Sequence, residues 1–163
     1  MSVGLYRVVD VEPMITEDDD FETGILTCYL ENGDSLVLYN IPPEIARAIG
    51  KLRSDDLILD VSNDRDTIYD LLIMLAPRLG EIRNSLNSVV IDYFNFKTMT
   101  YRASVYLEID DIKVKKGMIP SHAIFLALLF NKPVYITDEV LKISRELNEN
   151  SGEDDEDDFA SIA

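Results

Sequence analysis

Several residue types that carry chemistry are scarce in this chain of 163 residues, which has no tryptophan, no glutamine, one cysteine and one histidine. The single cysteine, Cys28, cannot form a disulfide within the chain, and its apolar neighbours predict a buried thiol. Zinc sites that combine several Cys and His ligands are excluded. A Ser-His-Asp triad would depend on His122, whose neighbour Ser121 is adjacent in sequence, so a second serine would be needed.

Long apolar runs and phosphate-binding glycine loops are also missing. The longest uncharged apolar run, residues 123–130, is far too short to span a bilayer. The amino terminus MSVGLYRVVD has neither a basic start nor an apolar signal segment. No glycine-rich loop or nucleophile-elbow motif is present. We therefore expect a cytoplasmic protein that carries no strong catalytic motif.

Acidic residues are abundant: 31 Asp and Glu against 15 Lys and Arg give a net charge of −16. Six of the acids form the run 153–158, and residues 149–163 read as an acidic, disordered tail. A surface this acidic repels phosphate backbones unless a cation or a local basic patch intervenes. The charge therefore suits a basic protein partner better than a nucleic acid.

The first half of the chain alternates strand and helix signals. Asn32-Gly33 favours a tight hairpin turn between two β-rich runs, and Gly80 stands where a helix would stop. We expect Asn63 or Asp64 to cap the second helix. The predicted order is a strand at 4–11, an acidic loop at 12–23, two strands within 24–40, a helix at 41–52, a strand at 56–61 and a helix at 66–79.

The second half repeats this order. It predicts a long hairpin from 88–96 and 100–110, a strand at 112–116, a helix at 120–130, a strand at 133–137 and a helix at 138–147. Both halves read as three strands, a helix, a strand and a helix. We therefore predict an α+β fold with antiparallel or mixed sheets, made of a duplicated unit (1–80 and 86–148) in one domain, 1–148. The grouping of hairpins argues against a doubly wound parallel sheet.

A few polar residues stand where chemistry could be placed, and each also has a structural interpretation. Ser121 fits the cap of its helix, and His122 would follow in the first turn, where it could accept a proton, bind a metal or be a polar rim residue. Asp70 lies on the mixed border of an amphipathic helix, and Glu44 opens a helix whose dipole stabilises a carboxylate. Residues 17–20 could bind a divalent cation, although a solvated loop fits their spacing better.

Three segments between about residues 36 and 141 resemble the bifunctional nuclease domain family. The family motif Arg-Pro-Ser-Asp-Ala-Ile-Ala-Leu-Ala, followed by Pro-Ile-Tyr-Val and an acidic helix start, is similar to residues 119–127, 133–136 and 138–141. The family segment Arg-Pro-x-Thr-His-Asp-Leu-Leu, ahead of a helix ending in Leu-Gly, resembles residues 65–72 and 79–80. Thr-Phe-Tyr-Ala is faintly visible at residues 100–103, and the family's Glu-Ala pair is approximated by Glu44 and Ile45.

This resemblance implies that the chain has the fold of the bifunctional nuclease domain family. It also implies hydrolysis of DNA or RNA, assisted by a divalent cation such as Mg²⁺ or Mn²⁺. Asp70 and Glu44 would supply carboxylates, and His122 would be a base in place of the family's Asp. Arg65 and Ser121 would bind the substrate. The chain departs from the family at three polar positions, with Ile119 for Arg, His122 for Asp and Tyr69 for His.

These departures leave three functions open. The first is a nuclease that uses Asp70, Glu44 and His122. The second is a non-catalytic binding or regulatory module of the same fold with a basic protein partner. The third is an enzyme acting on a small metabolite in the cleft between the repeats. We also expect a homodimer, because the hairpin edges need cover.

Overall fold

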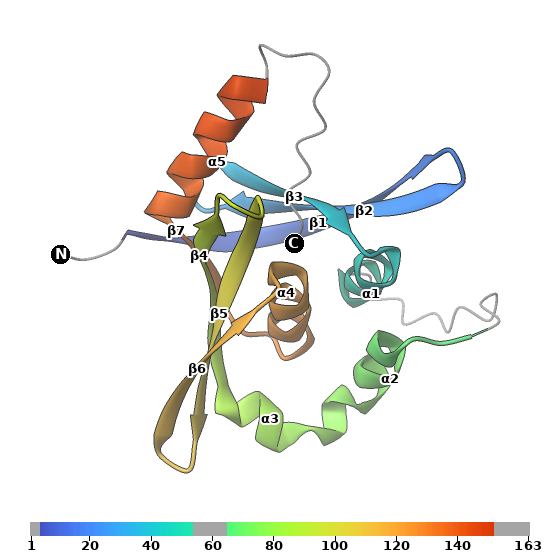
Figure 1. The fold of residues 1–163 in the computed structure, drawn as a ribbon. Helices are drawn as coiled ribbons and strands as arrows, with labels where there is room; N and C mark the ends of the chain where they lie inside the picture. The colour runs from blue at the N-terminus through green and yellow to red at the C-terminus, as the bar shows by residue number, and fades with distance from the viewer. Residues whose placement is uncertain (1–3, 54–64, 152–163) are drawn as a thin grey trace.

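The computed structural model describes residues 4–53 and 65–151, which form one seven-stranded sheet and its helices (Figure 1). The sheet order is β3-β2-β1-β7-β4-β5-β6. The elements are β1 (Leu5–Asp18), β2 (Phe21–Leu30), β3 (Ser35–Ile41), α1 (Pro43–Arg53), α2 (Ile68–Leu75), the 3₁₀ turn η1 (Ala76–Arg78), α3 (Gly80–Ser85), β4 (Leu86–Asn95), β5 (Thr100–Ile109), β6 (Ile112–Met118), α4 (Pro120–Leu129), β7 (Val134–Thr137) and α5 (Asp138–Ser151).

Two antiparallel meanders, β1–β2–β3 and β4–β5–β6, meet on either side of β7. β7 is antiparallel to β1 and parallel to β4, so the sheet is mixed. This confirms the predicted α+β class. In Figure 1 the two meanders run across each other, and α4 lies in the angle between them.

The core fills that angle. α4 buries most of its residues, including Ile124 and Phe125, each at most 1 % exposed. α1 contributes one apolar face, on which Ile45, Ala48 and Ile49 are buried. Each buried aliphatic or aromatic side chain of this size stabilises the fold by roughly 1.5–3 kcal/mol. The two helices therefore hold the meanders together from inside the bend.

The hairpin turns explain one correct and one wrong prediction. Gly33 adopts a φ of 90°, and the backbone N–H of Asp34 donates to Asn32 Oδ1 at 3.0 Å, which confirms the turn at Asn32-Gly33. The loop expected at 12–23 is instead continuous strand on both sides of a two-residue turn. Asp19 and Asp20 adopt φ angles of 42° and 74°, which a tight hairpin turn requires. The acidic side chains point into solvent, so they leave the backbone free to pair.

The second helix differs from its prediction at both ends. Its cap is Thr67, whose hydroxyl accepts from the backbone N–H of Asp70 at 3.3 Å, and not Asn63 or Asp64. Its regular turns end at Leu75 because Pro77 has no N–H to continue the hydrogen-bond ladder. Gly80 does not stop a helix but opens the short, unpredicted α3.

Helix α4 begins two residues earlier than a cap at Ser121 would allow. Ile119 occupies the cap position with no side-chain hydrogen bond, and Pro120 is the first helical residue. Proline is favoured there because its fixed φ suits a helix start. Ser121 is therefore inside the helix and fully buried, and the prediction that it caps α4 is wrong.

Other boundaries complete the comparison with the sequence. The hairpin of β4 and β5, strands β6 and β7, and helix α5 all form where predicted. Helix α5 continues to Ser151, three residues into the segment assigned to the acidic tail. The strand expected at 56–61 and the rest of the tail lie outside the described residues, and the duplication stays a prediction. Within residues 4–53 and 65–151, no helix is long and apolar enough to cross a membrane.

Candidate functional site

Helices α1, α2 and α4 meet beside the inner face of the sheet, and Tyr69 of α2 lies at their junction. Its ring is 6.3 Å from the ring of His122 and 5.2 Å from that of Phe125, measured between centroids, and both contacts are edge-on. The Tyr69 side chain is half-buried. Tyr69 thus connects the first turn of α4 to α2.

Glu44, in the first turn of α1, is near enough for its charge to act on Tyr69. Burial raises the pKa of the Tyr69 phenol, and the negative charge of Glu44 raises it further. The phenol therefore stays protonated at neutral pH and can donate a hydrogen bond. We call Glu44, Tyr69 and His122 the helix-junction site. It combines a carboxylate, a phenol and an imidazole, which can bind a cation or exchange protons with a ligand.

Asp70 has a different environment from its neighbour Tyr69. Its Oδ1 accepts from Lys51 Nζ at 2.5 Å, and its Oδ2 accepts from the backbone N–H of Thr67 at 2.9 Å and the Thr67 hydroxyl at 3.0 Å. Partial burial opposes ionisation of Asp70, but the hydrogen bonds from Lys51 and Thr67 outweigh it, so the pKa of Asp70 is lowered. Oδ1 of this carboxylate therefore holds α2 to α1, and Oδ2 completes the capping box at the start of α2.

The predicted site residues are brought together only in part. Lys51 follows Glu44 by seven residues, about 10 Å along the axis of α1, so Asp70 is anchored two turns from Glu44. No contact within the described residues joins Asp70 to Glu44 or His122. Glu44 and His122 both lie near Tyr69, whereas Asp70 binds Lys51 and Thr67.

The two predicted substrate contacts lie in opposite environments. Arg65 is exposed, three residues before α2, and Ser121 is fully buried within α4. No group of three or more His, Cys, Asp or Glu side chains arranged to hold a metal occurs within residues 4–53 and 65–151. The roles predicted for Asp70, Glu44, His122, Arg65 and Ser121 stay predictions.

Sequence reasoning treated Tyr69 only as a departure from the family pattern. The structure makes Tyr69 the central residue of the helix-junction site, because it contacts His122, another residue that differs from the family motif. A signal was present in the sequence, since both departures replace polar family residues. Nothing in the spacing could have paired them, because 53 positions separate them in the chain.

Together the fold and the site define an α+β protein with a polar helix junction beside a mixed sheet. Neither a known family model nor a curated protein matches the chain. The resemblance to the bifunctional nuclease domain family therefore stays a prediction.

Proposed function

We propose that this protein is a cytoplasmic binding module with the fold of the bifunctional nuclease domain family, and that it recognises a basic protein segment. The observation that carries the proposal is the acidic tip of the β1–β2 hairpin, which we define as residues 17–22. Glu17, Asp18, Asp19, Asp20 and Glu22 are all exposed. Figure 1 shows this hairpin extending beyond α1.

The acidic tip contains like charges that destabilise the hairpin. Glu17 and Glu22 lie directly opposite each other in the strand register. Like charges in opposed positions destabilise a hairpin. Arg47 offsets part of this by pairing with Glu22 at 2.5 Å. A concentration of negative charge that does not serve the fold supports a role in attracting a cationic partner.

An apolar side chain lies within the acidic tip. Phe21 is 77 % exposed, beside the two-residue turn. An aromatic ring surrounded by carboxylates can pack against the aliphatic stems of Lys or Arg and attract their charged ends. The tip therefore offers both the charge and the contact area that a basic peptide needs.

The test uses a labelled peptide rich in Lys and Arg and measures its affinity by fluorescence anisotropy. The double variant Asp19→Asn/Asp20→Asn removes two charges and keeps residues that tolerate a positive φ. We expect it to weaken binding, and added salt to weaken binding to the wild type. The matched control is Asp110→Asn/Asp111→Asn, in the β5–β6 turn, where the two aspartates also have positive φ angles. Equal loss in both variants, or no binding to the wild type, would reject the proposal.

A second candidate function is metal-assisted hydrolysis of DNA or RNA, and the contact between Tyr69 and His122 favours it. These residues stand where the resembled family has His and Asp, and their ring centroids lie 6.3 Å apart, so two of the altered polar positions are neighbours in this fold. His122 would be the base, with Glu44 and Asp70 as carboxylates and Arg65 and Ser121 as substrate contacts.

Nuclease activity is measured on single- and double-stranded DNA and on RNA, with Mg²⁺ or Mn²⁺ and then with EDTA. We expect His122→Ala and Glu44→Gln to slow cleavage if this function is real. Cleavage by the wild type no faster than by His122→Ala would identify the activity as a contaminant. The exposed Glu81→Gln in α3 is the control.

We also propose a homodimer. Within the described residues the sheet ends at β3 and β6, whose outer edges have no paired strand. Edge strands are common sites of two-fold association. Sedimentation velocity at micromolar concentration tests this, and a monomer there would reject it.

A further inference from the structure

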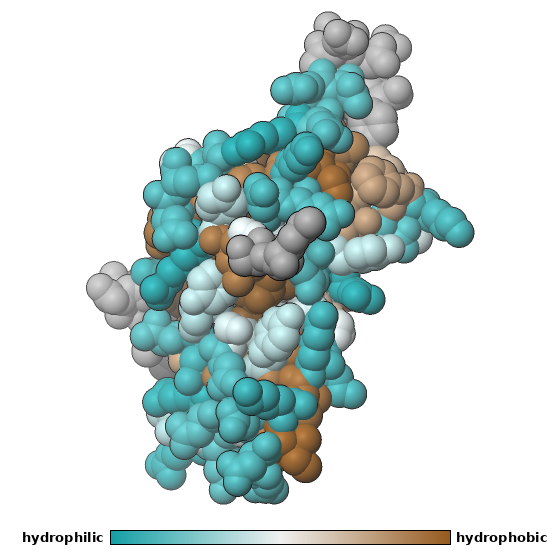
Figure 2. All heavy atoms as spheres, turned by 90° about the vertical axis from the view of Figure 1, so that its left-hand side faces the viewer, coloured by the Kyte–Doolittle hydropathy of each residue, from teal (hydrophilic) through white to brown (hydrophobic). Residues whose placement is uncertain are grey.

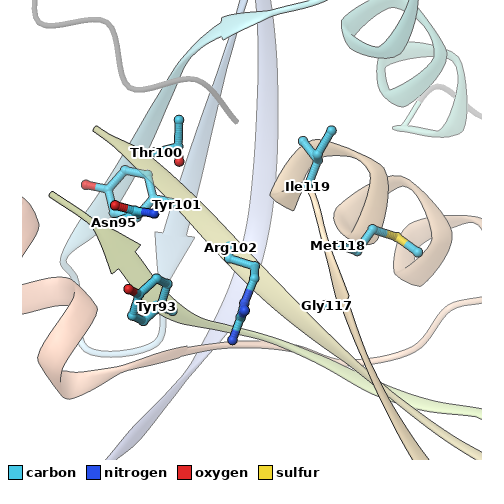
Figure 3. A pocket seen from close by; sticks show the side chains of 8 residues that line it. All are labelled: Tyr93, Asn95, Thr100, Tyr101, Arg102, Gly117, Met118 and Ile119. Carbon is cyan, nitrogen blue, oxygen red and sulfur yellow. The ribbon is translucent and has the colours of Figure 1, made fainter. Parts of the chain in front are cut away.

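A cavity of about 320 Å³ lies where β4, β5 and β6 approach the start of α4 (Figure 3), and none of its lining residues belongs to the helix-junction site or the acidic tip. Tyr93, Asn95 and Arg102 line it on the side of β4 and β5, and Met118 and Ile119 line the other side. Arg102 of β5 and its register partner Tyr93 of β4 are both exposed and lie on the same side of the sheet. Figure 2 shows the side of the molecule that lies on the left in Figure 1; its surface is largely hydrophilic, with an apolar patch at the lower end and smaller apolar areas in the middle and toward the top.

Two neighbours position Arg102. Its guanidinium carbon lies 5.1 Å from the centroid of the Tyr93 ring, a stacked cation–π arrangement. On β6, Gly117 leaves room for the arginine stem, because a Cβ at that position would lie 3.3 Å from Arg102 Cδ. The aliphatic part of Arg102 therefore packs over Gly117, and the Tyr93 ring covers one planar face of the guanidinium. The N–H groups at its edge remain available.

Arg102 has no carboxylate partner within the described residues, although the chain carries a net charge of −16. Three other arginines, Arg47, Arg53 and Arg145, each bind a carboxylate. A guanidinium that is packed on an aromatic ring and kept from acidic neighbours presents a forked set of donors to a carboxylate or phosphate.

The other residues of the cavity add donors and apolar surface. Asn95 Oδ1 accepts from the backbone N–H of Lys97 at 2.9 Å and of Thr98 at 3.4 Å, which orients its amide. The Asn95 NH₂ group is left to donate to a ligand. Ile119 is 50 % exposed and, with Met118, forms an apolar wall. The cavity thus combines donors of hydrogen bonds on one side with apolar atoms on the other.

We infer that this cavity binds a small anion with a carboxylate or phosphate monoester group attached to a flat apolar body. Arg102 and Asn95 bind the anionic oxygens, and the apolar body packs against Met118 and Ile119. This site is independent of the proposed binding of a basic partner, because it lies on different strands and selects the opposite charge.

Isothermal titration with phenyl phosphate, benzoate, inorganic phosphate and neutral benzyl alcohol tests the inference. We expect phenyl phosphate or benzoate to bind more tightly than inorganic phosphate, and benzyl alcohol to bind least. The first two ligands distinguish a phosphate site from a carboxylate site. A charge-assisted hydrogen bond contributes about 1.5–3 kcal/mol, so Arg102→Met is expected to weaken binding roughly ten- to hundred-fold.

Arg83→Met provides the matched control, since Arg83 is an exposed arginine of α3 outside the cavity. Gly117→Ala is a second test, because its added Cβ displaces the arginine stem, and we expect several-fold weaker binding with an unchanged circular dichroism spectrum. The Asp19→Asn/Asp20→Asn variant should bind the anions like the wild type, which separates this inference from the proposed function. Wild-type affinity in Arg102→Met, or no saturable binding of any of the three anions, would overturn it.

Discussion

Replacing Asp70 with alanine is the most informative single change, because it separates a structural role for this carboxylate from the catalytic role implied by the family resemblance. The change removes the Lys51 ion pair and both hydrogen bonds that Asp70 accepts from Thr67. The Thr67 hydroxyl still accepts from the backbone N–H of residue 70 in this variant, so only the reciprocal half of the capping box is lost, and a hydrogen bond typically contributes about 0.5–1.5 kcal/mol. The ion pair is better shielded than a surface pair, since the Asp70 side chain is only 18 % exposed and that of Lys51 31 %.

We expect Asp70→Ala to lower the free energy of unfolding by about 2 kcal/mol at pH 7, summing roughly 1 kcal/mol for the hydrogen bonds from Thr67 and roughly 1 kcal/mol for the ion pair. Urea denaturation followed by circular dichroism measures it. Asp66→Ala is the control, because Asp66 is exposed and precedes the helix cap. A double-mutant cycle with Lys51→Met isolates the contribution of the ion pair.

The pH dependence provides a second check on the same residue. Because folding lowers the pKa of Asp70, its charged form is favoured in the folded state. Its stabilisation is therefore fully present above the unfolded pKa and is lost as the pH falls through the lower folded pKa, below about pH 4. The difference between wild type and Asp70→Ala should shrink in that range. An Asp70→Ala variant as stable as the Asp66→Ala control at pH 7 would refute this account.

Two further predictions concern buried positions. Burial raises the pKa of the Cys28 thiol to about 12, so the native protein should not react with a thiol reagent at pH 8. In urea the exposed thiol should react with one equivalent of the reagent per chain. Rapid labelling of the native protein would contradict this. Gly24→Ala should destabilise the protein by about 1–3 kcal/mol in urea denaturation, because the new Cβ would lie 2.9 Å from both the Ala46 Cβ and the carbonyl oxygen of Ile41. Gly80→Ala is its control, since nothing lies within 4 Å of a Cβ there; equal stabilities of the two variants would contradict the packing argument.

Much of the fold follows from local patterns. The β-rich runs around the turn at Asn32-Gly33 predicted paired strands, and local helix signals predicted helices at 41–52 and 120–130, because these signals depend on neighbours a few residues apart. One error occurred where composition was used in place of pattern. The acidic segment around Asp19 was predicted to be a loop, although two residues of positive φ are enough to join two long strands.

The candidate site depended on contacts that local patterns do not contain. Tyr69, His122 and Glu44 come from three helices, and only the packing of those helices brings them to one place. Asp70 was predicted to be catalytic because of its motif position, but the structure places Lys51 and Thr67 on its oxygens. Arg102 gave no signal in the sequence, because its stacking on Tyr93 and its seat on Gly117 follow from strand register.

The sequence by itself determined the α+β class, most strands and helices, the burial of Cys28 and the excess of negative charge, because each depends on composition or on residues close in the chain. Only the tertiary structure decided which polar side chains lie close together in the folded protein. Those meetings depend on the order of strands in the sheet and on how α1, α2 and α4 pack in its bend, and residues as far apart as Glu44 and His122 become neighbours of Tyr69 only when the chain folds.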